Sequence, residues 1–358
     1  MAVLLVVLWH WFPQTGGVNW APNGALGVDL FFVLSGFLIT SILLSFRSAV
    51  DARRKRAAFA LGDFYLRRAL RLFPLYYVVL LGAWLWPAGS TGTAIRTDWP
   101  WYAVFAQNLR TFETRAWDGF LSHFWSLAVE EQYYLVWGLV VLFLPRRILP
   151  ALALSAAVVA IATRAIGVAV SNGEIAAMGF WEILTPACFD GLGLGSLLAL
   201  AREGEARASI WHRALRVASR FAPIPALLVI ATYRLEPAVW YLFGRTAVAL
   251  LALRLLFWAL DGAASASGPG RWLEWEPIVG FGRRSYGLYV FHNIVPFLVT
   301  SVAGALGRRF VSAAWLLAPL ESPAVARCIW ALLLVALAYG SWRFLEAPIN
   351  SLKNRFTP

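Results

Sequence analysis

Residues 1–13 read MAVLLVVLWHWFP, an apolar run in which His10 is the one ionisable side chain. The run is apolar enough to lie inside a bilayer, where an ionisable group is costly and marks a candidate functional site. A neutral imidazole that only donates a hydrogen bond to a neighbouring helix is the other interpretation, and this run alone does not choose between them. Residues 1–12 would form a helix of about 18 Å, shorter than a bilayer core of about 30 Å, so we expect a truncated first helix.

The composition indicates a membrane protein. Of the 358 residues, 60% are hydrophobic and 14% are charged, against about 45–50% and about 25% in soluble domains. The apolar residues fall into runs of about 20, the length of a membrane-spanning helix, and 19 Trp and 11 Tyr suit two interfacial belts. We therefore predict an all-α fold, a polytopic transmembrane helical bundle in which residues 1–358 form a single domain. The ten expected spans are 1–13, 26–46, 71–88, 124–145, 149–170, 183–201, 221–234, 238–260, 285–306 and 328–348.

The distribution of positive charge along the chain indicates membrane topology rather than nucleic-acid binding. The net charge is +12, but the Lys and Arg residues gather in alternate connections between apolar runs, so no nucleic acid is expected as a partner. The positive-inside rule places the basic set, including 53–56, in the cytoplasm, with both termini on that side. We expect a multi-pass protein of a bacterial cytoplasmic membrane. Its two cysteines, Cys188 and Cys328, suggest neither a disulfide framework nor a metal site.

Asp29 lies in the stretch GALGVDLFF, residues 24–32, at the start of the second expected span. A carboxylate near a helix N-terminus is stabilised by the helix dipole, which is one explanation for it. The functional interpretation places Asp29 near His10, because a short connection joins the first two spans.

Three arginines occur in FYLRRALRLFPLYY, residues 64–77. Arg67 and Arg71 share a helix face at i and i+4, and Arg68 approaches Arg71 at i+3. Arginines near a span end commonly snorkel to the interface. Three converging guanidinium groups would equally suit a polyanion such as a nucleotide phosphate.

Adjacent carboxylates, Glu130 and Glu131, interrupt the apolar stretch HFWSLAVEEQYY, residues 123–134. Glu130 shares a helix face with Ser126 and Tyr133 or Tyr134, so we expect it to point inward, either as a catalytic group or as a structural carboxylate. His123, in the same stretch, is expected to be interfacial. His292, in FGRRSYGLYVFHN (residues 281–293), is expected to make a core hydrogen bond.

Taken together, these stretches resemble the membrane-bound acyltransferase type 3 family over essentially the whole chain. The resemblance rests on VVLWHWFP, GVDLFFVLSGFLIT, FYLRRALRLFPLYY, FWSLAVEEQYYL, FGRRSYGLYVFHN and the terminal Glu346-Ala347-Pro348. Two departures stand out. The family has an Arg about three turns before its histidine, where this sequence has not yet begun, and Cys188 occupies a position where many relatives have Arg.

The resemblance implies an O-acyltransferase that uses acyl-CoA, with acetyl as the simplest group, and no metal. His10 matches the general base, Arg67, Arg68 and Arg71 match the arginines that face the donor, and Glu130 matches the carboxylate of the fourth span. Glu130 or Asp29 would orient the imidazole of His10, as a carboxylate does in a histidine-based triad. The acceptor would be a hydroxyl of a carbohydrate or glycolipid at the membrane. Acceptor identity, acyl length and oligomeric state stay open.

A polytopic secondary transporter or flippase is the alternative, because intramembrane ionisable groups also mark transport pathways. Transporters commonly show inverted repeats and paired broken helices, and neither is apparent in the sequence. A catalytically inactive membrane scaffold is a third hypothesis.

Overall fold

The computed structural model describes residues 2–14, 17–19, 21–86, 92–203, 210–233, 235–263, 273–309 and 321–356, and in these ranges the chain forms helices and no strand. The all-α prediction is confirmed. The α-helices are α1 (Ala2–Trp11), α2 (Asn23–Asp51), α3 (Ala57–Leu85), α4 (Ile95–Ala103), α5 (Gln107–Thr114), α6 (Trp125–Phe143), α7 (Leu149–Val170), α8 (Ile175–Glu182), α9 (Phe189–Arg202), α10 (Ile210–Phe221), α11 (Pro223–Thr232), α12 (Pro237–Ala263), α13 (Glu276–Arg283), α14 (Ser285–Phe291), α15 (Ile294–Arg309), α16 (Pro323–Ser341) and α17 (Ala347–Ser351). Short 3-10 turns include η2 (Gly119–Phe124) and η4 (Thr185–Cys188), and a π-helical turn, η8 (Trp342–Glu346), joins α16 to α17.

Five helices are long and apolar enough to cross a membrane, and the number rises to eight when each bent pair counts as one span. The bent pairs are α8 with α9, α10 with α11, and α14 with α15, with bends of 80°, 48° and 45°. The other two expected spans correspond to α1, which is a shorter apolar helix, and to α6. The described residues thus support a polytopic helical protein. They also contain broken helices, whereas no paired broken helices were apparent in the sequence.

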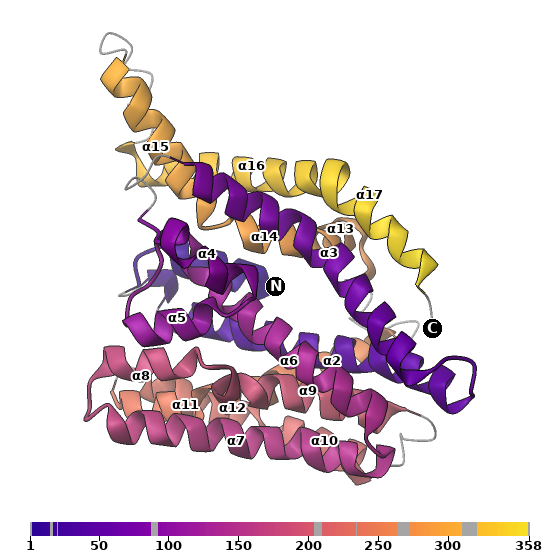
Figure 1. Ribbon diagram of the computed structural model, residues 1–358. Coiled ribbons are helices and arrows are strands. Elements are labelled where there is room, and N and C mark those ends of the chain that lie inside the picture. The colour runs from indigo at the N-terminus through magenta and orange to yellow at the C-terminus, as the bar shows by residue number, and fades with distance from the viewer. Residues whose placement is uncertain are drawn as a thin grey trace.

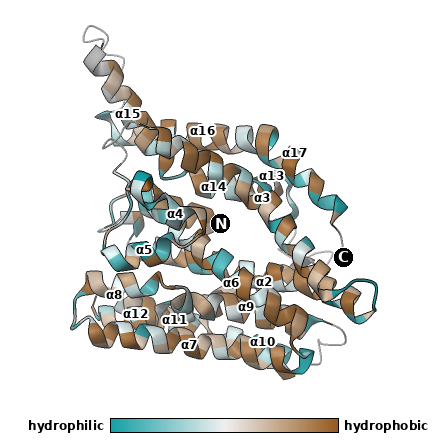
Figure 2. Cartoon of the chain, viewed as in Figure 1, coloured by the Kyte–Doolittle hydropathy of each residue, from teal (hydrophilic) through white to brown (hydrophobic). Residues whose placement is uncertain are grey.

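Apolar residues predominate along the long helices (Figure 2), and many of them are exposed. Leu81 and Leu85 on α3, Val158 on α7 and Leu332 on α16 are all more than half exposed. Water would make such contiguous apolar surface unfavourable, whereas lipid chains accommodate it. The exposed faces therefore match contact with a bilayer.

The helices lie in layers, with α7, α9 and α12 on one side and α3, α14 and α16 on the other, and with α2 and α6 between them (Figure 1). The contact between α2 and α9 is the most extensive in the described chain. It depends on Gly36 and Gly195, because a Cβ on Gly36 would overlap the carbonyl oxygen of Leu192 and one on Gly195 would overlap that of Val33. Small residues allow membrane helices this close approach.

The first helix is held against the bundle by its C-terminal end. α1 packs on α2 and also contacts α14. The indole Nε1 of Trp11 donates a hydrogen bond of 2.8 Å to the backbone carbonyl of His292, and Arg327 donates one of 2.9 Å to the backbone carbonyl of Trp11. These bonds fix the turn of α1 that carries His10.

Candidate active site

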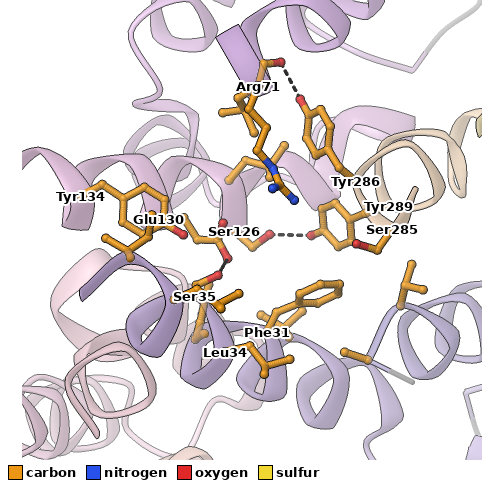
Figure 3. Close-up of a pocket in the computed structure, with 18 of the residues that line it drawn as sticks. Phe31, Leu34, Ser35, Arg71, Ser126, Glu130, Tyr134, Ser285, Tyr286 and Tyr289 are labelled. Atoms are coloured by element: carbon orange, nitrogen blue, oxygen red, sulfur yellow. Dashed lines mark hydrogen bonds between the residues drawn. The ribbon is translucent and has the colours of Figure 1, made fainter. Parts of the chain in front are cut away.

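Two cavities in the described part of the bundle bear on the candidate site. The first, which we call the arginine cavity, has a volume of about 500 Å³ and lies between α2, α3, α6 and the segment from α13 to α14 (Figure 3). Its walls are mainly apolar, with polar groups gathered on the α3 and α6 side. The lining residues are Ala2, Val3, Val28, Phe31, Phe32, Leu34, Ser35, Leu38, Ile39, Ile42, Arg68, Arg71, Leu72, Ser126, Leu127, Glu130, Tyr134, Gly282, Ser285, Tyr286 and Tyr289.

Two of the three predicted arginines face this cavity. The guanidinium group of Arg71 points into it (Figure 3), and within the described ranges no carboxylate lies at ion-pair distance from it. Arg68 also lines the cavity, pairs with Glu131 at 3.2 Å and lies over the ring of Tyr134. Arg67 points elsewhere and donates a hydrogen bond of 3.1 Å to the carbonyl of Phe356. The structure therefore brings Arg68 and Arg71 together and sets Arg67 apart.

Glu130 points inward, as its helix position predicted. Its Oε1 accepts a hydrogen bond of 2.8 Å from the hydroxyl of Ser35, across the arginine cavity wall from α6 to α2 (Figure 3). Glu131 faces a different direction and pairs with Arg68. Glu130 is therefore the carboxylate of this pair that lines the cavity.

The second cavity, which we call the histidine cavity, has a volume of about 460 Å³. Its lining is rich in aromatic rings and also includes His10, Glu182 and Arg245. The complete lining is Val6, Trp9, His10, Gln14, Pro22, Gly24, Ala25, Val28, Trp117, Ser122, His123, Trp125, Gly179, Glu182, Ile183, Tyr233, Trp240, Tyr241, Arg245 and Tyr289.

His10 lines the histidine cavity with an exposed side chain. Its Nδ1 lies 2.8 Å from the carbonyl oxygen of Val6 and 3.3 Å from Nε2 of His292. Neither Asp29 nor Glu130 has a hydrogen bond to His10 in the described chain. The nearest polar partner from another helix is a second imidazole, which the sequence had suggested only as a core group.

His292 and His123 form a buried group behind His10. His292 is fully buried and His123 is 3% exposed. The ring centroid of His292 lies 4.9 Å from that of His10 and 4.5 Å from that of His123. His123, expected at the interface, is instead held by a contact of 3.1 Å between its Nε2 and the carbonyl of Val290.

The loop before His123 is anchored by a carboxylate outside the spanning helices. Asp118 accepts hydrogen bonds from the hydroxyl of Tyr102 and, at 2.5 Å, from the backbone N–H of Ala94. Burial raises the pKa of Asp118, although the hydrogen bond from Tyr102 opposes this change. These bonds position the neighbouring Trp117, whose ring lines the histidine cavity.

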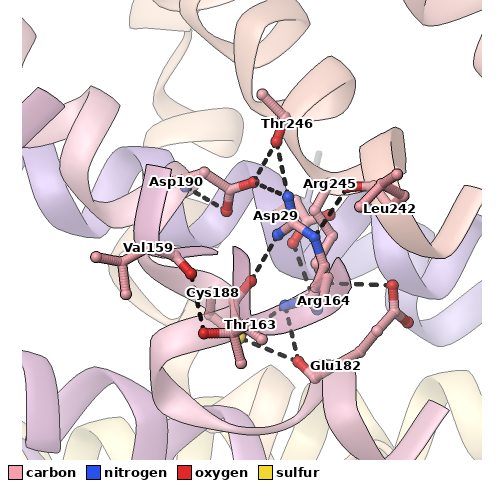
Figure 4. Close-up of polar contacts among 12 residues, drawn as sticks. Asp29, Val159, Thr163, Arg164, Glu182, Cys188, Asp190, Leu242, Arg245 and Thr246 are labelled. Carbon is pink, nitrogen blue, oxygen red and sulfur yellow. Dashed lines mark hydrogen bonds and ion pairs between the residues drawn. The ribbon is translucent and has the colours of Figure 1, made fainter. Parts of the chain in front are cut away.

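Asp29 belongs to a separate cluster of charges (Figure 4). Its Oδ1 lies 3.4 Å from Nη2 of Arg245, and a second ion pair of 2.9 Å joins Arg164 to Asp190. All four side chains are at most 3% exposed. Arg245 also contacts Glu182 and the sulfur of Cys188. Asp29 thus ties α2 to α12 rather than contacting His10.

Several site residues escaped the sequence interpretation. Arg164 and Arg245 lie inside apolar spans. An arginine in such a position predicts a buried ion pair, so the sequence did contain a signal for these two residues. Tyr289 carried no such signal, because a Tyr in an apolar helix resembles an ordinary packing residue. Its place in the site depends on how α14 meets α6.

An α-helical membrane bundle with an arginine-lined cavity on one side and a histidine-lined cavity on the other has the parts of a two-substrate transferase. Residues 1–344 match the acyltransferase domain family, and the chain belongs to that family. It is 28% identical to the peptidoglycan O-acetyltransferase OatA of Listeria monocytogenes, over 99% of this chain and 55% of the relative. It is 27% identical to the O-acetyltransferase OatA of Staphylococcus aureus, over 98% of this chain and 55% of the relative.

YrhL of Bacillus subtilis is 28% identical over 98% of this chain and 53% of its own length. The chain therefore spans about half the length of the curated relatives it matches. No solved structure is significantly similar to it.

Proposed function

We propose that this chain is a membrane O-acyltransferase that moves an acyl group, most simply acetyl, from acyl-CoA to a hydroxyl group of a carbohydrate. The observation that carries the proposal is the pair of cavities that share a wall. Arg71 faces the arginine cavity and His10 faces the histidine cavity, while Val28 and Tyr289 line both. A donor and an acceptor could thus approach one reaction centre from two directions.

The arginine cavity suits the donor. Coenzyme A is a polyanion whose phosphates favour guanidinium groups, and Arg68 and Arg71 supply two of them. The apolar lining that includes Phe31, Leu34 and Leu38 suits the less polar pantetheine arm and the acyl group. Within the described chain the free cation at Arg71 is the stronger anion site, because Arg68 already pairs with Glu131.

The histidine cavity suits a carbohydrate acceptor. Trp117, Trp125 and Trp240 offer flat apolar faces against which the C–H faces of a sugar ring can pack. Glu182 and Arg245 add polar groups that can orient sugar hydroxyls. The three relatives are named as O-acetyltransferases, the Listeria protein for peptidoglycan and the Bacillus protein as a putative peptidoglycan enzyme, which supports a carbohydrate in preference to a lipid hydroxyl.

In the proposed reaction His10 acts as the general base. Its imidazole takes the proton of the acceptor hydroxyl while the hydroxyl oxygen attacks the thioester carbonyl carbon. A new C–O bond forms and the C–S bond breaks. The CoA thiolate then leaves and takes up the proton from the imidazolium. The products are an O-acyl carbohydrate and free CoA.

The same arrangement supports a proposal for which side of the membrane each cavity faces. On α2 and at Pro22 just before it, the residues that line the histidine cavity lie between 22 and 28, and those that line the arginine cavity lie between 28 and 42. The basic connection 53–56 follows the end of α2, and the positive-inside rule places it in the cytoplasm. The donor would therefore enter from the cytoplasm and the acceptor from the outer side of a bacterial cytoplasmic membrane, with both termini inside.

The test is an assay with labelled acetyl-CoA on membranes that contain the chain, with and without a soluble peptidoglycan fragment as acceptor. We expect labelled acceptor from the wild type and a loss of about 10²–10⁴-fold in His10→Ala, the usual contribution of a general base. His212→Ala, which removes a histidine outside both cavities, is the matched control. Equal rates in His10→Ala and wild type at equal expression would remove His10 from the mechanism. Acceptor accumulation in vesicles without acylation would instead indicate a transporter.

A further inference from the structure

The hydrogen bonds around His10 determine which of its nitrogens is basic. A carbonyl oxygen can only accept, so Nδ1 of His10, 2.8 Å from the carbonyl of Val6, carries the ring proton. Nε2 of His292, 3.3 Å from the same Nδ1, must then present a lone pair and share that proton with the carbonyl of Val6. Nδ1 of His292 lies 2.5 Å from the carbonyl of Tyr289 and carries the proton of the second ring. His292 is therefore neutral with its proton on Nδ1, and His10 also carries a proton on Nδ1, an assignment made from hydrogen-bond partners.

We propose that His292 is a positioning residue of the reaction: together with the carbonyl of Val6 it accepts the Nδ1 proton of His10, orients the ring and leaves Nε2 free to accept the acceptor's proton. This inference rests on the proposed function of His10 as the base. Both bonds of His10 in the described chain use Nδ1, which leaves Nε2 on the opposite edge of a ring that lines the histidine cavity. His292 itself is fully buried and lines neither cavity, so it acts through His10.

His292 occupies the position beside His10 that the sequence analysis had assigned to the carboxylate of Glu130 or Asp29. In a histidine-based triad a carboxylate accepts the Nδ1 proton, selects the tautomer and stabilises the imidazolium. Here Asp29 pairs with Arg245 and Glu130 binds Ser35. A neutral imidazole lone pair can accept the same proton, and it stabilises the imidazolium less strongly than an anion would.

Neighbouring groups hold the rings of His10 and His292 in place. Trp11, next to His10, donates its indole N–H to the backbone carbonyl of His292 at 2.8 Å. The groups that face His292 are the rings of His10, His123 and Tyr289, from α1, η2 and α14. In the described ranges no carboxylate and no arginine contacts its ring, so its lone pair is available to His10.

The experiment compares two variants of nearly equal size in the full-length chain. His292→Gln places an amide oxygen near the position of Nε2 and keeps an acceptor for His10, whereas His292→Leu removes it. We expect His292→Leu to lose about tenfold or more in kcat, because a less firmly oriented ring and a less stable imidazolium both slow proton transfer. We expect KM for acetyl-CoA to stay within about twofold, because the donor binds elsewhere. His292→Gln should recover most of kcat.

The pH profile separates positioning from general disruption. Losing the acceptor destabilises the imidazolium of His10, so the acidic limb of kcat/KM should move to lower pH in His292→Leu and return toward the wild-type position in His292→Gln. Equal losses in the two variants, with the acidic limb unchanged, would assign His292 a merely structural role and overturn the proposal.

A second measurement needs no activity. The chain has four histidines, so ¹⁵N-histidine NMR of the detergent-solubilised protein can assign each ring with single-histidine variants. We expect His10 to be protonated at Nδ1 in the wild type, and in His292→Leu the Nδ1 resonance of His10 should shift, because only the carbonyl of Val6 still accepts that proton. A wild-type His10 protonated at Nε2 would overturn the inference. An active His10→Ala protein with the expected NMR result would instead reject the proposed function and leave the tautomer assignment standing.

Discussion

Val28 on α2 and Tyr289 on α14 are the two residues that line both the arginine cavity and the histidine cavity. The hydroxyl of Tyr289 donates to the carbonyl of His123 at 2.8 Å and, with that proton used, accepts from the hydroxyl of Ser126 at 2.5 Å. Its ring also meets the edge of Phe31. This side chain is thus fixed at three points in the wall that separates the proposed donor from the proposed acceptor.

Tyr289→Ala should open that wall. Water from the histidine cavity would then reach the thioester, so we expect acetyl-CoA hydrolysis without acceptor to rise several-fold while transfer to acceptor falls. Release of free CoA, measured with a thiol reagent in the absence of acceptor, reports this change. Tyr289→Phe keeps the ring and loses only the hydroxyl, so it should show much less hydrolysis. Hydrolysis at the wild-type rate in a folded Tyr289→Ala protein would show that Tyr289 does not separate the substrates.

The donor site is tested by a pair of neighbouring arginines. Arg71→Ala removes a cation that points into the arginine cavity, and loss of one charge-assisted contact of about 1.5–3 kcal/mol should raise KM for acetyl-CoA roughly 10–100-fold. Arg67→Ala, one helical turn earlier, removes a side chain that binds the carbonyl of Phe356 instead. Its KM should stay close to the wild-type value.

The kinetic readout for these variants is KM for acetyl-CoA at two salt concentrations. The wild-type KM should rise with ionic strength, because salt screens a phosphate–guanidinium contact at a partly open site. This dependence should weaken in Arg71→Ala and persist in Arg67→Ala. An equal increase of KM in both variants would place the phosphates outside the arginine cavity.

The fold could be predicted from the sequence because lipid imposes a simple pattern on it. Apolar runs of spanning length, such as 149–170, reappear as single helices with the same bounds. The bends could not be predicted in this way. The sharp turn between α8 and α9 lies inside an apolar stretch around Pro186, and hydropathy does not distinguish a broken span from a straight one.

The site was predictable where one helix face determined it and unpredictable where several helices meet. Glu130 points inward because its position on α6 requires it, and Arg71 faces the cavity for the same reason on α3. Arg67 is the exception, because the C-terminal residue Phe356 supplies a partner that spacing within α3 cannot reveal. His10 and His292 are 282 residues apart, so only the folded chain brings the second imidazole to the first.

The buried ion pair between Arg164 and Asp190 should be important for stability. Both side chains are at most 2% exposed, and Arg164 also donates to the carbonyl of Ala187 at 2.6 Å. Asp190→Asn or Arg164→Met leaves one charge buried without its counterion, which costs about 3–5 kcal/mol. A lower thermal midpoint in detergent measures this effect. The exposed pair of Arg216 and Asp261 is the control, and Asp261→Asn should change stability by at most about 1 kcal/mol.

The closest helix contact, between α2 and α9, gives the last prediction. A Cβ at Gly36 or Gly195 would overlap a backbone carbonyl of the facing helix, and backbone cannot move aside as a flexible side chain can. Gly36→Val should therefore separate α2 from α9 and lower the thermal midpoint by an amount that corresponds to about 1–3 kcal/mol of overpacking. Gly62→Val, on α3 with open space around its Cα, tests for a general effect of replacing glycine by a branched residue in a helix. Because α2 lines both cavities, Gly36→Val should also lose transfer activity at temperatures where it is still folded. Equal midpoints for the two variants would show that this contact tolerates a side chain.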